Sequence, residues 1–141
     1  MVKTEGIIAL VASVREKANK FITEELKKRG ITDVSTPHGG IFVHLFRNGE
    51  LSMGEIAQRI DRDKSTVTAL VKRLVDLGYV EASPSPSDSR VTMVRLTQKG
   101  AVLENDFKEI SKDLLKKAYG GSTDLEREVL VRLLMRVKNN L

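Results

Sequence analysis

The sequence predicts a mainly α-helical protein with a small β-hairpin after its middle helices. Apolar residues recur every three or four positions over most of the 141 residues, which is the spacing of amphipathic helices. Residues 79–83 and 91–96 are instead short runs with strand character around a loop of prolines and serines. A content of 40% hydrophobic and 30% charged residues is ordinary for one globular domain of this length.

Two helices are expected before residue 50. The range Ile7 to Arg29 carries one apolar stripe, and Gly30 ends it. Thr36 is the expected N-cap of the next helix, because Pro37 suits the first helical position. Asn48-Gly49 stops that helix. The first helix stands at a chain end, so its stripe can pack on its own core or on a second chain.

The central stretch, residues 51–78, is expected to form two helices joined by a tight turn. Ser52 and Glu55 have the spacing of a capping box at the start of the first helix. Asp63 is the expected N-cap of the second. The apolar residues of the second helix lie at helical spacing and predict its buried side: Val67, Leu70, Val71, Leu74 and Val75.

The opposite side of the second helix is polar and carries no acidic residue. Its side chains are Lys64, Ser65, Thr68, Lys72 and Arg73, with Thr66 beside them. A short helix, a turn and a helix with such a face is the layout of a helix-turn-helix that contacts nucleic acid. A helical hairpin with a merely solvated basic face is the alternative, so the surrounding chain has to decide.

The two strand-like runs form a β-hairpin directly after this helix. The loop between them, Pro84 to Arg90, ends in arginine and has no apolar residue besides its prolines. A hairpin in this place is typical of a wing, whereas a plain structural hairpin is the alternative. With it, the lobe is predicted to be a winged helix-turn-helix.

Two helices are expected after the hairpin. Thr97 caps a long helix that runs to about Ala118. Thr123 and Glu126 form a capping box for the last helix, which ends at the C-terminus. A helical region built from both chain ends would form a dimer that places two lobes side by side.

The sequence predicts no metal site, no cofactor and no enzymatic activity. It has no cysteine, which excludes disulfides, thiol catalysis and thiolate metal sites. His38 and His44 are six residues apart, so they do not share a helical face as i,i+4 ligands would. His38, near its helix start, stays a candidate for lining a ligand pocket. Phosphate-binding glycine loops and catalytic motifs are absent from the sequence.

The expected location is the cytoplasm, and no membrane partner is predicted. The N-terminus lacks the layout of a signal peptide, and no apolar run approaches the roughly 20 residues of a membrane span. The net charge of +5 favours a polyanionic partner.

Several motifs occur together and carry a family resemblance. They are Leu51-Ser52-Met53-Gly54-Glu55-Ile56-Ala57, Asp63-Lys64-Ser65-Thr66-Val67-Thr68, Val71-x-x-Leu74-Val75-x-x-Gly78-Tyr79-Val80, Asp88-Ser89-Arg90 and Leu96-Thr97-Gln98-Lys99-Gly100. In this combination the chain closely resembles the MarR family of bacterial and archaeal winged-helix regulators. The similarity is densest over residues 51–100, whereas the flanking helices match mainly in placement and length.

The resemblance implies a homodimer that binds a palindromic operator in double-stranded DNA. The recognition helix would start near Lys64, and the wing would be Pro84 to Arg90. The arginine of the wing motif, Arg90 here, would enter the minor groove, steadied by Asp88. Many members are repressors released by small, often phenolic or otherwise anionic effectors that bind between the dimer helices and the lobe. This wing has Arg90 as its only basic residue, where many members have several.

The resemblance also implies a division of the chain. Residues 1–34 would be an N-terminal dimerisation helix, residues 35–100 the DNA-binding lobe, and residues 101–141 the C-terminal dimerisation helices. The predicted function is a sequence-specific transcriptional regulator that acts as a ligand-responsive homodimeric repressor. The alternatives are an effector-independent activator or architectural DNA binder, or a winged-helix domain that binds protein. The effector residues are unassigned.

Overall fold

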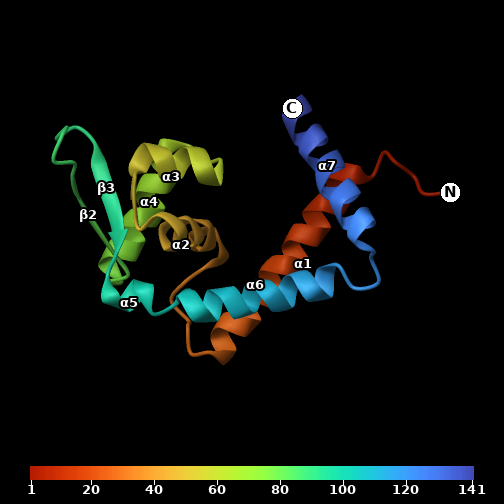
Figure 1. The fold of residues 1–141 in the computed structure, drawn as a ribbon, viewed down its shortest axis with the longest axis horizontal. Coiled ribbons are helices and arrows are strands. Elements are labelled where there is room, and N and C mark those ends of the chain that lie inside the picture. The colour runs from red at the N-terminus through yellow and green to blue at the C-terminus, as the bar shows by residue number, and fades with distance from the viewer.

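The computed structural model describes residues 1–141 and shows a lobe beside three longer helices (Figure 1). In chain order the elements are α1 (Ile7–Lys28), α2 (Thr36–Asn48), β1 (Glu50–Ser52), α3 (Met53–Ile60), α4 (Lys64–Asp76), β2 (Val80–Pro84), β3 (Thr92–Leu96), α5 (Gln98–Ala101), α6 (Glu104–Ala118) and α7 (Asp124–Asn140). The lobe holds α2 to α5 and the sheet, and both termini lie on the side away from the β2–β3 hairpin (Figure 1). The predicted mainly α fold with a β-wing is confirmed.

The helix starts follow the predicted caps with one exception. In α3 the Glu55 N–H donates to Ser52 Oγ at 3.1 Å, and the Ser52 N–H donates to Glu55 Oε1 at 3.0 Å, which confirms the capping box. Asp63 caps α4 as predicted, and the predicted capping box of Thr123 and Glu126 caps α7. The predicted N-cap of α2 is wrong by one residue, because Ser35 and not Thr36 holds this position.

The cap of α2 depends on a buried histidine. Ser35 has an extended backbone, and its N–H donates to His38 Nδ1 at 3.3 Å. The hydroxyl of Ser35 also lies 2.9 Å from His38 Nδ1. A side chain three residues into the helix therefore satisfies the backbone ahead of it, as a glutamate does in a capping box.

The sheet is antiparallel with the strand order β1-β3-β2. Leu51 pairs with Val94, and Ala82 pairs with the same residue from the other side. Val94 is fully buried, so the centre of the sheet packs on the helices of the lobe. Strand β1 was not predicted from the sequence, and it adds a third strand to the expected hairpin.

The helix expected over residues 97–118 is broken into two. Thr97 caps α5 as predicted, but α5 ends at Ala101 and α6 begins at Glu104. At the break the Leu103 N–H donates to the carbonyl of Gly100, three residues back, which tightens the chain into a 3₁₀-like turn. This turn places Leu103 in the core at 8% exposure.

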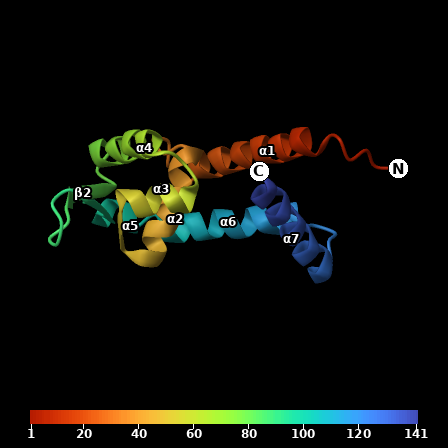
Figure 2. The same ribbon diagram turned by 90° about the horizontal axis from the view of Figure 1, so that it is seen from above.

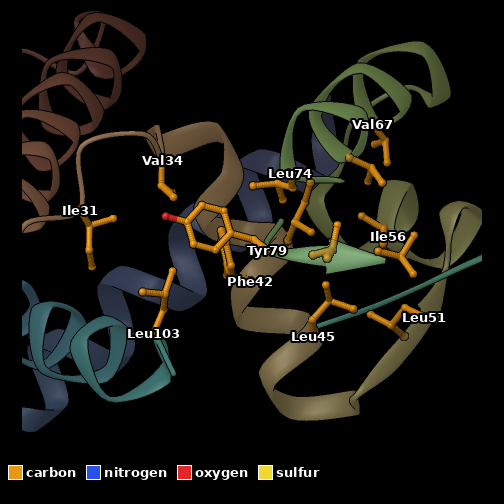
Figure 3. Packing of buried hydrophobic residues seen from close by; sticks show 14 of the residues in the cluster. Ile31, Val34, Phe42, Leu45, Leu51, Ile56, Val67, Leu74, Tyr79 and Leu103 are labelled. Atoms are coloured by element: carbon orange, nitrogen blue, oxygen red, sulfur yellow. The ribbon is translucent and has the colours of Figure 1, made fainter. Parts of the chain in front are cut away.

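The core of the lobe is a single apolar cluster around Phe42. The Phe42 ring lies 5.7 Å from that of Tyr79, nearly edge-on, and 5.1 Å from that of Phe107. Figure 3 shows Tyr79 between Phe42 and the loop that carries Val34. In α4, Val67, Val71 and Leu74 are buried as predicted and Leu70 is half-buried, whereas Val75 is exposed and its prediction was wrong.

The three remaining helices differ in how they join the lobe, because α1 and α6 bury Leu26 and Ile110 in its core whereas α7 buries no residue. Arg29, just after α1, pairs with Asp106 at 3.1 Å and with Glu109 at 2.6 Å, which joins the end of α1 to α6. The hydrogen bond and charge of Arg29 lower the pKa of Glu109. In α7 no residue is buried, and Lys138 near its end lies 3.6 Å from Asp61 in the α3–α4 turn. None of the helices is both long and apolar enough to cross a membrane.

Candidate nucleic-acid interface

The polar side of α4 is exposed over its whole length. Val67, Val71 and Leu74 fix the orientation of the helix by facing the core. The opposite side presents the predicted residues Lys64, Ser65, Thr68, Lys72 and Arg73 as exposed side chains, with Thr66 half-buried. The burial of one stripe thus sets which side chains can meet a partner.

Two of the hydroxyls on this surface donate within the protein. Ser65 Oγ donates to Asp63 Oδ1 at 2.8 Å, and Thr68 Oγ1 donates to the carbonyl of Lys64 at 2.7 Å. The Thr66 N–H donates to the same Asp63 oxygen at 2.7 Å, and these bonds lower the pKa of Asp63. In this state Ser65 and Thr68 offer a partner their lone pairs, and Thr68 also offers a methyl group.

The wing presents one guanidinium held by one carboxylate. Arg90 Nε lies 3.1 Å from Asp88 Oδ1, and Arg90 Nη2 lies 3.2 Å from Asp88 Oδ2, so the contact is bidentate. The Arg90 N–H also donates to Asp88 Oδ1 at 3.0 Å. The hydrogen bonds from the Arg90 side chain and backbone hold the pKa of Asp88 below its usual value. Because the Arg90 side chain is 89% exposed, it remains available to a partner.

A groove joins α4 to the wing. Its volume is about 370 Å³, and its lining comes from the start of α3, the start of α4 and the end of the wing loop. Among the predicted residues, the groove brings together Lys64, Thr68 and Arg90. Sequence reasoning missed Met53, Gly54 and Thr92, which line it too.

The other predicted residues lie outside the groove. Lys72 continues along the exposed side of α4, two turns beyond Lys64. Arg73 lies close enough to His38 of α2 for its charge, after the larger effect of burial, to lower the pKa of the imidazole. Arg73 therefore extends the basic surface toward α2 and away from the wing.

A separate cavity of about 230 Å³ lies between α1, α2 and α6. Its lining is Ile22, Leu26, Val34, Ser35, Thr36, Gly39, Gly40, Val43, Phe107, Ile110, Ser111 and Leu114. His38 does not belong to this lining, contrary to its candidacy from the sequence. It is 6% exposed, and its buried Nε2 has no hydrogen-bond partner.

Comparison with known proteins shows to which family this chain is related. The model of the MarR family matches residues 32–91. Over 131 residues the chain is 34% identical to the transcriptional repressor IacR of Pseudomonas putida, covering 93% of this chain and 77% of the relative. The chain belongs to the MarR family of winged helix-turn-helix transcriptional regulators. This MarR-family chain is also 32% identical to the transcriptional regulator BilQ of Clostridioides difficile, covering 96% of this chain and 89% of the relative.

Solved structures of MarR-family proteins share the fold. A MarR mutant from Escherichia coli complexed with operator DNA aligns with a TM-score of 0.81 and 24% identity, covering 96% of this chain and 99% of that one. BpsR of Bordetella bronchiseptica, whose DNA binding is regulated by 6-hydroxynicotinic acid, aligns with a TM-score of 0.80 and 19% identity, covering 94% and 98%. At these identities the likeness shows the arrangement of the elements.

Proposed function

We propose that this MarR-family protein is a homodimeric repressor that binds a palindromic operator and is released by a small effector. The observation that carries the DNA contact is the groove in which Lys64 and Thr68 of α4 face Arg90 of the wing. A helix and a wing that converge in this way fit a major groove and the neighbouring minor groove.

The residues of the interface divide by role. Lys64, Lys72 and Arg73 neutralise phosphates, which gives affinity and salt dependence without sequence information. Ser65, Thr66 and Thr68 are short enough for close approach, and a threonine methyl can meet a thymine methyl. The start of α4 has no asparagine or glutamine, so the bidentate contact with adenine is not available there.

Arg90 reads the shape of the minor groove, and Asp88 holds its guanidinium in place. A narrow minor groove, as in A·T-rich DNA, concentrates negative potential that attracts arginine. The bidentate contact with Asp88 limits the directions that Arg90 can take before DNA binds. We therefore expect the operator to carry an A·T-rich step beside each half-site.

A second copy of the chain would cover the apolar stripes of α1 and α7. The exposed large hydrophobic side chains concentrate on these helices: Ile7, Ile8, Leu10, Val11, Val14, Leu125, Val129, Leu130, Val131, Leu133, Leu134 and Met135. Figure 2 shows that α7 and the first half of α1 lie at the end of the molecule away from the lobe. A concentration of exposed large apolar side chains on two helices marks an interaction site. Residues 1–34 and 101–141 would then be the dimerisation parts, and residues 35–100 the DNA-binding lobe.

Self-association has a direct test. Leu134→Glu places a charge in the proposed interface and replaces an exposed residue of α7. We expect light scattering to give the mass of two chains for the wild type and of one chain for the variant. A wild-type monomer at micromolar concentration would contradict the proposal.

The effector would bind in the cavity between α1, α2 and α6. Part of its wall, Val34 and Ser35, belongs to the loop that connects α1 to α2. In the same loop, Asp33 accepts a hydrogen bond of 2.6 Å from the hydroxyl of Tyr79, which follows the end of α4 in the chain. A ligand that binds one position of this loop better than another would shift the lobe and thereby its affinity for DNA.

The experiment on the function as a whole is a binding titration with DNA from around the gene. We expect fluorescence anisotropy to show nanomolar binding to one duplex in the presence of excess random DNA, with affinity that falls as salt rises. Equal affinity for random duplexes would favour the architectural DNA binder. No binding at low salt would favour a winged-helix domain that binds protein.

A further inference from the structure

The C-terminal end of α4 is held by the segment that follows β3. The chain leaves α4 through Leu77, Gly78 and Tyr79, and the backbone carbonyls of all three accept hydrogen bonds from this segment. The Thr97 N–H donates to the Tyr79 carbonyl at 3.0 Å, and Thr97 Oγ1 donates to the Gly78 carbonyl at 2.5 Å. Lys99 Nζ donates to the Leu77 carbonyl at 2.7 Å. The exit of α4 is therefore anchored at three consecutive carbonyls.

Lys99 differs from Thr97 in this anchor, because it supplies a charge. The carbonyls at the end of an α-helix have no partner within the helix, and they carry the negative end of its dipole. An ammonium group stabilises such an end more than a neutral donor does. The last turn of α4 holds Arg73 and Asp76, whose charges offset each other. The positive charge that balances the dipole at this end thus comes from Lys99.

A second contact holds the ammonium group in place. Lys99 Nζ lies 4.5 Å from the centroid of the Tyr79 ring, which is a cation–π distance. The ring is itself fixed, since Tyr79 is buried and its hydroxyl donates to Asp33. Lys99 takes part in none of the ion pairs of the chain, although it is an exposed residue. Its charge is therefore directed at the end of α4.

The anchor also joins α4 to the helices outside the lobe. Lys99 lies on α5, and α6 begins three residues after α5 ends. Figure 1 shows α5 at the foot of the β2–β3 hairpin, beside the start of α6. A Cβ on Gly100 would lie 2.1 Å from the Tyr79 carbonyl oxygen, so α5 and the exit of α4 are in direct backbone contact. The position of α4 is thus tied to the segment that leads into the proposed dimerisation part.

The anchor lies far from the groove that joins α4 to the wing. That groove includes Lys64 at the start of α4. The 13 residues of the helix separate Lys64 from Leu77, which is a distance of about 20 Å. Lys99 can therefore act on the proposed DNA surface through the orientation of α4.

We propose that Lys99 is a positioning residue for DNA reading, because it holds α4 at one angle to α5 and α6. This role rests on the proposed function, in which α4 enters the major groove. In a dimer both recognition helices have to enter their half-sites together. A lobe with a loose α4 end is competent for the operator only in a fraction of its molecules, and its apparent affinity falls by that fraction.

The first test compares operator and random DNA by anisotropy, well below the melting temperature. Lys99→Met keeps the length of the side chain but removes its charge and its donor. A cation at a helix end shifts an equilibrium by about twofold to fivefold. With about threefold per lobe, the operator affinity of the dimer should fall by about tenfold. Random duplexes bind through phosphate contacts that tolerate other helix angles, so their affinity should change by less than about twofold.

Two variants serve as controls. Lys99→Arg keeps a charged donor that reaches the Leu77 carbonyl, so it should restore most of the preference for the operator. Lys27→Met removes an exposed lysine of α1 and should leave the preference unchanged. A lower melting temperature of Lys99→Met with an unchanged ratio of operator to random affinity would mean a merely structural role and would overturn the proposal.

The salt dependence separates positioning from a direct contact of Lys99 with phosphate. Positioning leaves the slope of log K against log salt unchanged in Lys99→Met, since no phosphate contact is lost. A phosphate contact in each lobe would lower the magnitude of this slope by about 1.8 and would weaken random and operator DNA alike. That second pattern would overturn the proposal.

Hydrogen exchange on the free protein provides a readout without DNA. The N–H groups of Leu77, Gly78 and Tyr79 donate to carbonyls in the last turn of α4, so they report whether this end is closed. We expect their exchange to be several-fold faster in Lys99→Met and close to wild type in Lys99→Arg. Unchanged exchange in Lys99→Met would overturn the anchor. Faster exchange in a protein whose wild type binds no duplex would instead refute the proposed function, and would leave the anchor established.

Discussion

Replacing Arg90 with alanine removes the only basic side chain of the wing loop. The side chain is 89% exposed, and its hydrogen-bond partner is the exposed loop residue Asp88, so the substitution leaves the core untouched. A specific arginine contact is worth about 1–3 kcal/mol, and the exposure of this one favours the lower end. Two lobes at about 1 kcal/mol each give a loss of roughly thirtyfold in operator affinity.

The same substitution changes the salt dependence by a predictable amount. Each phosphate contact contributes about 0.9 to the slope of log K against log salt. Two copies of Arg90 would therefore lower the magnitude of the slope by about 1.8, if both lie against the backbone of the minor groove. Anisotropy titrations of operator and random duplexes at four salt concentrations measure both quantities. Lys27→Ala is the control, because Lys27 is exposed on α1 and belongs to neither α4 nor the wing.

Two companion variants separate charge from orientation. Asp88→Asn keeps the charge of Arg90 but weakens its anchor, so operator affinity should fall while affinity for random DNA does not. Lys72→Ala should lower the affinity for all duplexes to a similar degree, as expected of a phosphate contact. Operator binding that is unchanged in both Arg90→Ala and Lys72→Ala would refute the assignment of this surface.

Three further predictions concern the lobe itself. Burial keeps the pKa of His38 below its ordinary 6.5, so the free energy of unfolding should be highest above pH 6.5 and fall as the pH drops through that value. In urea titrations His38→Gln should weaken this fall. An unchanged pH profile in this variant would count against a buried, neutral His38. Tyr79→Phe removes the hydroxyl that donates to Asp33 at 2.6 Å, so it should lower the free energy of unfolding by about 1–2 kcal/mol in the same urea titrations. No loss of unfolding free energy would mean that this hydrogen bond is not formed in solution. Gly100→Ala would place a Cβ 2.1 Å from the carbonyl oxygen of Tyr79 and should lower the melting temperature strongly. Gly39→Ala has open space around its Cβ and a helical backbone, so it should raise the melting temperature slightly. A melting temperature that is higher for Gly100→Ala than for Gly39→Ala would contradict the packing.

The titration of Tyr79 offers an independent check on its environment. Burial first, and then the hydrogen bond and charge of Asp33, raise its pKa to about 12. The folded state therefore holds this proton more tightly than the unfolded chain does.

Local sequence signals were sufficient for the parts of the fold that depend on local chemistry. The capping box of Ser52 and Glu55, the cap at Asp63 and the hairpin after α4 each depend on residues a few positions apart. Their geometry is set within one turn or one hairpin, so spacing alone predicts it. The contact between Asp88 and Arg90 is equally local, but it was expected only from the family resemblance of the Asp-x-Arg motif.

The features that the sequence analysis missed depend on contacts between distant segments. Strand β1 has three residues, and it exists because Leu51 pairs with Val94 on β3. The break after α5 has no proline, and the apolar spacing continues through Leu103, so a pattern of periodicity cannot reveal it. Ser35 became the cap of α2 because buried His38 reaches back to it, which is not a standard capping pair.

The candidate sites show the same division. The exposed side of α4 could be predicted, because the apolar stripe of that helix fixes the opposite side. The α1–α2–α6 cavity could not be predicted, because Leu26, Val34 and Ile110 meet only when three separate helices pack together.

The measurement that tests the account most directly is a hydroxyl-radical footprint of the full chain on DNA that flanks its gene. A homodimer with two winged lobes predicts two protected half-sites about 10 bp apart from centre to centre, with added protection in the neighbouring minor grooves. In Arg90→Ala the minor-groove protection should disappear while the central protection persists at higher protein concentration. A single protected patch, or protection that random competitor DNA removes equally well, would contradict the proposed dimeric operator binding.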